Sequence, residues 1–188
     1  MNMRKTREEA LHLLESYNES PALRRHAFAV EAVMRHFAER MGEDPEYWAL
    51  VGLLHDLDYE KYPEKHCVLT REILVKEGYE EPFIRAIESH GYGICTEVVP
   101  VLTMEKVLYT IDELTGLIYA TVLMRPDRSI SVLELKSVKK KFKAASFAQG
   151  VNRDVIKSGA KMLGMDLDHV ITETIEGMKK AKDLLDLN

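Results

Sequence analysis

The stretch ALVGLLHD, residues 49–56, joins an uninterrupted apolar run to a histidine–aspartate doublet. Asp44 and Pro45 stand before it, in the order of a helix N-cap and a first helical residue. The stretch therefore predicts an apolar helix that ends in His55 and Asp56. Because neighbouring helical residues differ by about 100° around the axis, the two side chains cannot share one apolar face. Both can still reach one ion if the helix end points at it.

Prolines and capping residues divide the rest of the chain into further helices. No alternating strand pattern of useful length and no repeat is present in the sequence. The sequence thus predicts an all-α protein, and its 188 residues suit one domain, residues 1–188. The predicted helices cover about 21–42, 45–56, 63–78, 81–90, 101–124 and 131–145, one segment after the cap Asn152, and 166–185.

The charge balance argues against one class of partner. The chain has 26 Lys and Arg against 31 Asp and Glu, which gives a formal net charge of -5. A protein that coats a nucleic-acid polymer needs an excess of basic residues over at least one face. We therefore expect a small anionic substrate as the partner, and no nucleic-acid polymer.

The sequence predicts a cytoplasmic protein that does not bind membranes. Its first residues lead into a mixed charged run, and no apolar stretch is long enough to cross a bilayer. Cys67 and Cys95 do not form a Cys-x-x-Cys pair. Since two such cysteines make a disulfide framework improbable, both are expected to be reduced thiols.

Helical periodicity separates core-facing histidines from solvent-facing ones. Apolar residues stand at helical spacing from His26, His66 and His90, which places these three on core-facing helix surfaces. Polar and charged neighbours surround His12 and His169. Taken singly, a core-facing histidine is more often a hydrogen-bonded core residue than a ligand. The combination of several such residues is what points to a metal.

Asp112 lies within a long apolar helix, where an unpaired carboxylate would be strongly destabilising. It must meet a cation, which is either a metal ion or an arginine such as Arg24 or Arg85. Buried imidazoles and carboxylates from separate helices are most economically explained by a shared metal ion. The six candidate ligands are His26, His55, Asp56, His66, His90 and Asp112.

The order His26, His55-Asp56, Asp112, with the doublet after a Leu-Leu run, resembles the HD-domain metal-dependent phosphohydrolase superfamily. The resemblance covers about residues 21–124 and implies a helical bundle, with a helical C-terminal extension over about 131–188. His66 and His90 look like the additional ligands of binuclear members, which implies two divalent ions. Asp56 is then the bridging, catalytic ligand.

The implied activity is hydrolysis of a phosphate ester or anhydride in a nucleotide-like small molecule through a metal-bound hydroxide. Mixed histidine and aspartate ligation suits Fe, Mn, Co or Zn better than Mg. Two alternatives stay open. One is a di-iron oxygenase similar to myo-inositol oxygenase, and the other is a non-catalytic metal-containing anion sensor.

The chain departs from its relatives just after the doublet. Tyr59 stands where members with a His-Asp-Ile-Gly-Lys segment carry a lysine, so no phosphate contact is implied there. His90 is followed by Gly91, which does not support a paired-histidine arrangement. Asp58 and Glu60 are expected at a solvated helix end, and a role for either in proton transfer stays open.

A lysine-rich helix is predicted beyond residue 124. Its buried face would leave lysines along one flank, which could line the entrance to the metals and hold a polyphosphate. The alternative is a solvated face whose lysines only cover apolar surface. The candidate substrate-binding residues are Lys136, Lys140, Lys143 and Arg153.

Overall fold

The computed structural model describes residues 5–188. Within these residues the chain forms nine α-helices and one 3-10 turn, and no β-strand, so the predicted all-α fold is confirmed. The helices are α1 (Arg7–Tyr17), α2 (Pro21–Met41), α3 (Pro45–Leu54), α4 (Val68–Lys76), α5 (Glu81–Ser89), α6 (Thr103–Leu123), α7 (Leu135–Lys143), α8 (Arg153–Leu163) and α9 (Leu167–Lys179), and the 3-10 turn is Pro63–Lys65.

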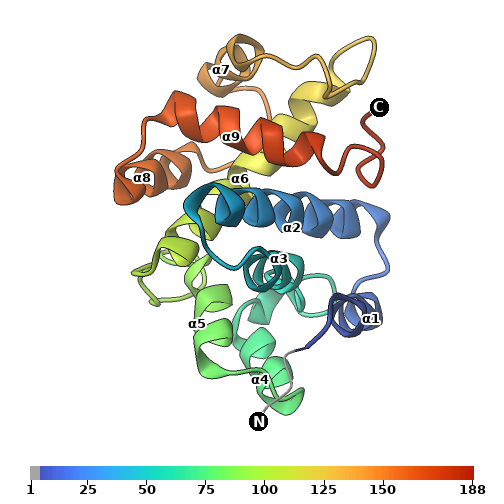
Figure 1. Ribbon diagram of the computed structural model, residues 1–188, viewed down its shortest axis with the longest axis vertical. Helices are drawn as coiled ribbons and strands as arrows, with labels where there is room; N and C mark the ends of the chain where they lie inside the picture. The colour runs from blue at the N-terminus through green and yellow to red at the C-terminus, as the bar shows by residue number, and fades with distance from the viewer. Residues whose placement is uncertain (1–4) are drawn as a thin grey trace.

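The long helix α2 runs through the middle of the molecule (Figure 1). Helices α1, α3, α4 and α5 lie on one side of it, and α7, α8 and α9 lie on the other. Helix α6 crosses between the two groups and packs against α2, α5, α7, α8 and α9. Residues that sit on α2, α6 and the end of α3 can therefore meet near the centre.

Two glycines let neighbouring helices approach α2 closely. A Cβ atom on Gly52 of α3 would lie 2.9 Å from the Val30 carbonyl oxygen, and one on Gly177 of α9 would lie 2.9 Å from Cα of Val33. Real Cβ atoms do not tolerate such distances to a backbone. The two glycines thus let α3 and α9 lie close against α2, and Gly52 keeps the doublet at the end of α3 near that helix.

Local capping explains where the helices begin and end. Ser20 accepts a hydrogen bond from the Leu23 N–H at the start of α2, and Gly42 ends that helix in the left-handed conformation. Asp44 accepts hydrogen bonds from two backbone N–H groups at the start of α3. These are the signals from which the sequence predicts both helices.

The structure departs from the predicted helices at four places. The lysine-rich helix expected over 131–145 covers only Leu135–Lys143. The expected helix over 63–78 is broken, because Cys67 adopts a positive φ of 69° between the 3-10 turn and α4. The last helix ends at Lys179, earlier than expected. Helix α1 was not singled out in the sequence, although Thr6 and Glu9 form a capping box at its start.

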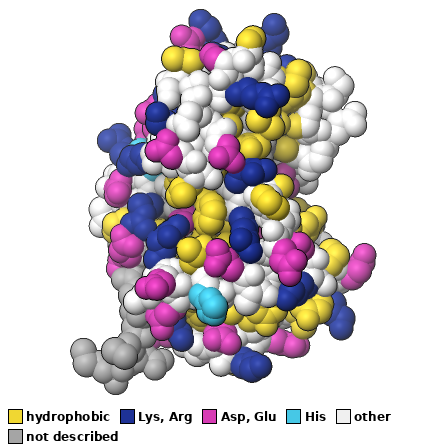
Figure 2. Space-filling model, turned by 90° about the vertical axis from the view of Figure 1, so that its right-hand side faces the viewer, with side chains coloured by type: hydrophobic (Ala, Val, Ile, Leu, Met, Phe, Trp, Pro, Cys, Tyr) yellow, Lys and Arg dark blue, Asp and Glu magenta, His cyan; other side chains and the backbone are white. Residues whose placement is uncertain are grey.

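In the part of the chain that the structure describes, none of the helices combines the length and apolar composition of a bilayer span. On the face shown in Figure 2, basic and acidic side chains alternate, so neither sign dominates.

Candidate metal centre

Six polar side chains from five separate segments meet near the centre of the molecule. They come from the second turn of α2, the end of α3, the break before α4, the end of α5 and the middle of α6. The six are His26, His55, Asp56, His66, His90 and Asp112, and the structure thus brings together all of the ligands that the sequence predicts.

A first group of donor atoms comes from His26, His55 and Asp112. Nε2 of His26 lies 3.1 Å from Nε2 of His55 and 2.9 Å from Oδ1 of Asp112. Nε2 of His55 lies 3.4 Å from the same Asp112 oxygen. The three donor atoms therefore form a small triangle that can hold a metal ion.

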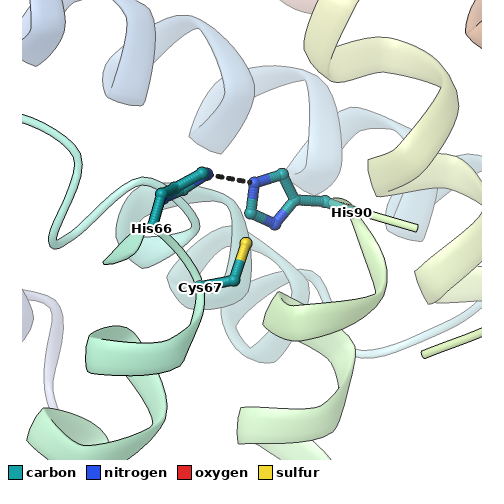
Figure 3. A group of neighbouring side chains, drawn as sticks. All are labelled: His66, Cys67 and His90. Atoms are coloured by element: carbon teal, nitrogen blue, oxygen red, sulfur yellow. Dashed lines mark hydrogen bonds between the residues drawn. The ribbon is translucent and has the colours of Figure 1, made fainter. Parts of the chain in front are cut away.

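A second group comes from His66, Cys67 and His90. Nε2 of His66 lies 3.2 Å from Nε2 of His90, and the Cys67 sulfur points toward the same place (Figure 3). One donor atom from each of the three lies within 4.8 Å of the others. The sequence did not mark Cys67 as a candidate, because a single cysteine beside a histidine is a weak signal.

The carboxylate of Asp56 lies between the two groups. Its Oδ2 atom is 3.6 Å from Nε2 of His26 and 3.4 Å from Nε2 of His55. Its Oδ1 atom is 3.3 Å from Nε2 of His66 and 3.4 Å from Nε2 of His90. One carboxylate therefore presents a different oxygen to each group of imidazoles.

Hydrogen bonds fix the protonation of three of the four imidazoles. Nδ1–H of His55 donates to the Gly52 carbonyl at 2.7 Å, and Nδ1–H of His90 donates to the Ile87 carbonyl at 2.5 Å. Nδ1–H of His66 donates to Oδ1 of Asp58 at 2.7 Å. In a neutral imidazole whose Nδ1 carries the proton, Nε2 is unprotonated and its lone pair can bind a metal ion. These lone pairs face the cluster.

Such an arrangement of donor atoms can hold a metal ion. Nε2 atoms of His66 and His90 face each other at 3.2 Å, so either a proton or a metal ion must lie between their lone pairs. Ligand atoms about 2.0–2.2 Å from one ion lie roughly 3–3.5 Å from each other, which is the spacing seen here. The donor set thus has the composition and the separations of a divalent metal site.

Comparison with known protein families agrees with this geometry. The family model for the HD domain matches residues 23–130, a segment that contains all six predicted ligands and more than half of the chain. The chain belongs to the HD-domain family. This superfamily consists mostly of metal-dependent hydrolases. No curated protein and no solved structure matches the chain.

Charged groups in this HD domain shift one another's ionisation. Burial opposes charge on His55, but the carboxylates of Asp56 and Asp112 outweigh it and raise the pKa of His55 well above its usual value. Burial also opposes ionisation of both aspartates, yet His55 and the other imidazoles hold the pKa of each carboxyl well below its usual range. Both carboxylates are therefore ionised and favour positive charge.

The expectation of a solvated Asp58 is wrong. This carboxylate is fully buried, and its Oδ2 atom accepts a hydrogen bond from the Thr70 N–H at 2.8 Å while Oδ1 holds His66. Burial opposes protonation of His66, but the hydrogen bond to Asp58 and the negative charges of Asp56 and Asp58 together outweigh it and raise the pKa of His66. Glu60 is exposed, as expected, and accepts hydrogen bonds from the backbone N–H groups of Glu19 and Ser20.

Asp112 does not pair with either arginine that the sequence offered as an alternative. Arg24 donates to the Asn18 carbonyl at 2.7 Å, and Arg85 pairs with Glu105. The partners of Asp112 in the HD domain are instead His26 and His55.

The two cysteines are free, and Cys95 lies beside Cys67 of the second group. The Cys67 and Cys95 sulfurs are 2.7 Å apart. Hydrogen bonding between the thiols raises the pKa of Cys67 and lowers the pKa of Cys95 to about 6. The acidity of Cys95 favours a thiolate at the edge of the metal centre.

A cavity of about 320 Å³ opens over the candidate metal centre. Within residues 5–188, none of the three predicted substrate-binding lysines contributes to its lining. Lys136 pairs with Glu134 at 2.7 Å on the exposed face of α7. The lining comprises His26, Asp56, Tyr59, His66, His90, Gly91, Ile94, Cys95, Asp112, Glu113, Gly116, Val151 and Val155.

Arg153 has a structural role, because its guanidinium binds backbone carbonyls. Its guanidinium donates to backbone carbonyls in the segment between α7 and α8, among them Phe142 at 2.9 Å and Val151 at 3.1 Å. The guanidinium also donates to the carbonyls of Ala144, Phe147 and Ala148. The sequence analysis predicts that Arg153 binds a substrate. In the structure, its N–H donors are instead occupied by these backbone carbonyls.

Proposed function

We propose that this protein is a phosphohydrolase that uses two divalent metal ions to cleave a phosphate ester or anhydride in a nucleotide-like small molecule. The observation that carries the proposal is the position of the Asp56 carboxylate, which presents Oδ2 to His26 and His55 and Oδ1 to His66 and His90. A carboxylate with one oxygen toward each of two imidazole groups is placed to bridge two ions.

The residues of the chain supply the shape of the site. His26, His55 and Asp112 would hold one ion, and His66 and His90 would hold the other, with Asp56 shared. The bonds from the imidazole Nδ1–H groups to Gly52, Ile87 and Asp58 would keep each Nε2 directed at its ion. Bound divalent ions would activate water for attack on phosphorus and stabilise negative charge on the phosphoryl group.

The charge of the donor set favours an anionic substrate. With neutral imidazoles, Asp56 and Asp112 contribute a formal charge of about -2, which offsets only half of the charge of two divalent ions. The remaining positive charge would attract a phosphate group into the cavity. Hydrolysis then breaks the bond from phosphorus to the leaving oxygen, water supplies the new oxygen, and the leaving oxygen takes up a proton.

The donor types also limit the metals. Imidazole and carboxylate together suit Fe, Mn, Co or Zn, whereas Mg prefers all-oxygen surroundings. A cavity of about 320 Å³ lies at the lower end of the range for small-molecule sites. We therefore propose a small phosphorylated substrate, and a cytoplasmic setting in which neither membrane nor nucleic-acid polymer is a partner.

Phosphate release from a panel of nucleotides and dinucleoside polyphosphates tests the proposal. The protein is loaded with Mn, Fe or Co, and each reaction is run in air and without oxygen. We expect hydrolysis of at least one compound at the same rate under both conditions. His55→Ala is expected to abolish it, and His12→Ala, a change at an exposed histidine of α1, is expected to retain it.

Three outcomes would contradict the proposal. Turnover that stops without oxygen would favour a di-iron oxygenase, because hydrolysis needs no oxygen. Binding without turnover across the whole panel would favour an anion sensor. Equal activity of the His55→Ala variant would place the chemistry at another site.

A further inference from the structure

Gly116 is a glycine in the middle of α6 that helix packing does not require. Three other helical glycines lie against a neighbouring helix: a Cβ on Gly52 or Gly177 would come within 2.9 Å of backbone atoms, and one on Gly159 would overlap Thr110. The nearest atom to a Cβ on Gly116 is Cγ2 of Val151, at 3.9 Å, which is an ordinary contact. Packing therefore leaves room for a side chain here.

Glycine inside a helix is less favourable than alanine, because it loses more backbone freedom on folding. Gly116 lies one turn after Asp112 on the wall of the cavity, at a position where alanine would favour the helix. What the missing side chain leaves behind is open space beside the candidate metal centre. A substrate group that displaces solvent from this space would bury its surface there.

Apolar side chains form the wall around that space. Val151 lies just before α8 and Val155 lies in its first turn, and Ile94, a residue that is 62% exposed, lies in the segment between α5 and α6. Val151 and Val155 belong to the part of the chain beyond the HD-domain match, which ends at residue 130. The C-terminal extension thus supplies part of the cavity wall.

The wall is held in a fixed place. Arg153 donates to the Val151 carbonyl at 3.1 Å and to the Phe142 carbonyl at 2.9 Å. The Asn152 N–H donates to Oε2 of Glu113 at 2.9 Å, which ties the start of α8 to α6. Both hydrogen bonds hold the backbone next to Val151 in place, so the Val151 side chain is fixed opposite Gly116.

The lining has no positive side chain for additional phosphates. Among the described residues, no Lys or Arg lines the cavity, and Glu113 adds a carboxyl beside Asp112. A second or third phosphate placed on this wall would meet apolar groups and a carboxyl. An uncharged group would bury its surface there favourably.

We infer that Gly116, Val151, Val155 and Ile94 form a subsite for the uncharged, apolar or aromatic part of a phosphate monoester. This inference rests on the proposed function for the phosphate end of the substrate. Gly116 is then the specificity-determining residue, since a larger side chain at this position would fill the subsite, and Gly116 itself supplies no ligand atom to the metal centre.

Binding of two phosphonates to the manganese-loaded protein tests the inference. Phenylphosphonate and methylphosphonate carry the same charged group, resist hydrolysis and differ only in the apolar part. One additional methylene in an apolar pocket is worth roughly tenfold in discrimination. We therefore expect the wild-type protein to bind phenylphosphonate at least about tenfold more tightly than methylphosphonate.

Variants at Gly116 are expected to lower the ratio of the two dissociation constants, and Gly116→Ala is expected to raise the Tm as well. Gly116→Leu is expected to reduce the ratio of the two dissociation constants to about one. Gly116→Ala is expected to raise the Tm by about 2–4 °C, because alanine favours the helix, while it lowers the ratio. Ala120→Leu, one turn further along α6 and outside the cavity lining, is the matched control and should keep the wild-type ratio.

A wild-type ratio near one would overturn the inference, as would an unchanged ratio in Gly116→Leu. A fall in Tm for Gly116→Ala would show that packing does require the glycine. The outcome is independent of turnover: absence of hydrolysis with the expected ratio would count against the proposed function alone. Hydrolysis of phosphate esters with a ratio near one would count against the subsite alone.

Discussion

The carboxylate of Asp58 lies directly behind the imidazole of His66 and accepts a hydrogen bond from its Nδ1–H at 2.7 Å. The other carboxylate oxygen accepts a hydrogen bond from the Thr70 N–H at 2.8 Å, so the group is held at both ends. Partners of this kind set the tautomer and direction of a metal-ligating histidine. Asp58 therefore links the start of α4 to the candidate metal centre.

Asp58→Asn is expected to weaken the ion held by His66 and His90. An amide cannot provide the charge that favours the Nδ1–H tautomer of His66, so affinity for this ion should fall by about 10- to 100-fold. Titration of the apoprotein with Mn in the presence of a competing chelator measures the change. Glu64→Gln is the control, because Glu64 is exposed in the nearby 3-10 turn. Equal losses in both variants would contradict a role for Asp58 behind His66.

The stability of the metal-free protein is expected to depend on pH in two directions. Because the pKa of His55 is raised in the folded protein, His55 contributes to the free energy of unfolding. This contribution is fully present below the ordinary pKa of 6.5 and is lost as the pH rises through the folded-state pKa. The lowered pKa of Asp56 and Asp112 gives a contribution that is present above their ordinary value of 3.8 and is lost as pH falls through the folded-state value.

Metal replaces the protons that the imidazoles bind. The increase in Tm on addition of Mn should therefore grow as the pH rises from about 6 to about 8, since fewer protons compete for the ligands. Thermal melts of the apoprotein and of the loaded protein over this range measure it. An increase that is independent of pH would mean that the histidines are not ligands.

Arg153→Lys is expected to destabilise the protein. Lysine cannot reach all the carbonyls that the guanidinium holds, and leaving partly buried acceptors without a donor should lower the free energy of unfolding by about 1.5–3 kcal/mol. Urea denaturation measures the loss. Unchanged stability together with lost binding of inorganic phosphate would instead support substrate binding by Arg153.

The lysines of α7 are expected to contribute little to activity. Lys136 is 82% exposed, and the three lysines lie outside the lining of the cavity. Replacing Lys136, Lys140 and Lys143 together by alanine should change kcat/KM by less than about fivefold, because exposed charges contribute little at this distance. A large rise in KM for polyphosphate substrates in the triple variant would restore the lysine flank as a binding surface.

Much of the fold follows from local signals in the sequence. Pro45 after Asp44 gives the start of α3, and Ser20 with Pro21 gives the start of α2. The break at Cys67 has no such signal, because a non-glycine residue at positive φ is imposed by its surroundings and is rarely encoded locally.

The candidate site was predictable as a set of residues, and its surroundings were not. Periodicity finds the core-facing histidines, but it does not tell that Asp58 is buried behind His66, because two separate elements provide the partners. The amphipathic pattern of α7 correctly buries Val138 and Phe142. The direction of its lysine face relative to the cavity depends on how α7 packs against α6 and α9, which no local pattern encodes.

The number and position of bound metal ions test the central claim most directly. Anomalous diffraction from crystals of the Mn-loaded protein, with elemental analysis of the same sample, is predicted to give two ions per chain. One should lie among His26, His55 and Asp112, the other should lie between His66 and His90, and Asp56 should contact both. A single ion held by His26, His55, Asp56 and Asp112 alone, in protein saturated with metal, would contradict the account.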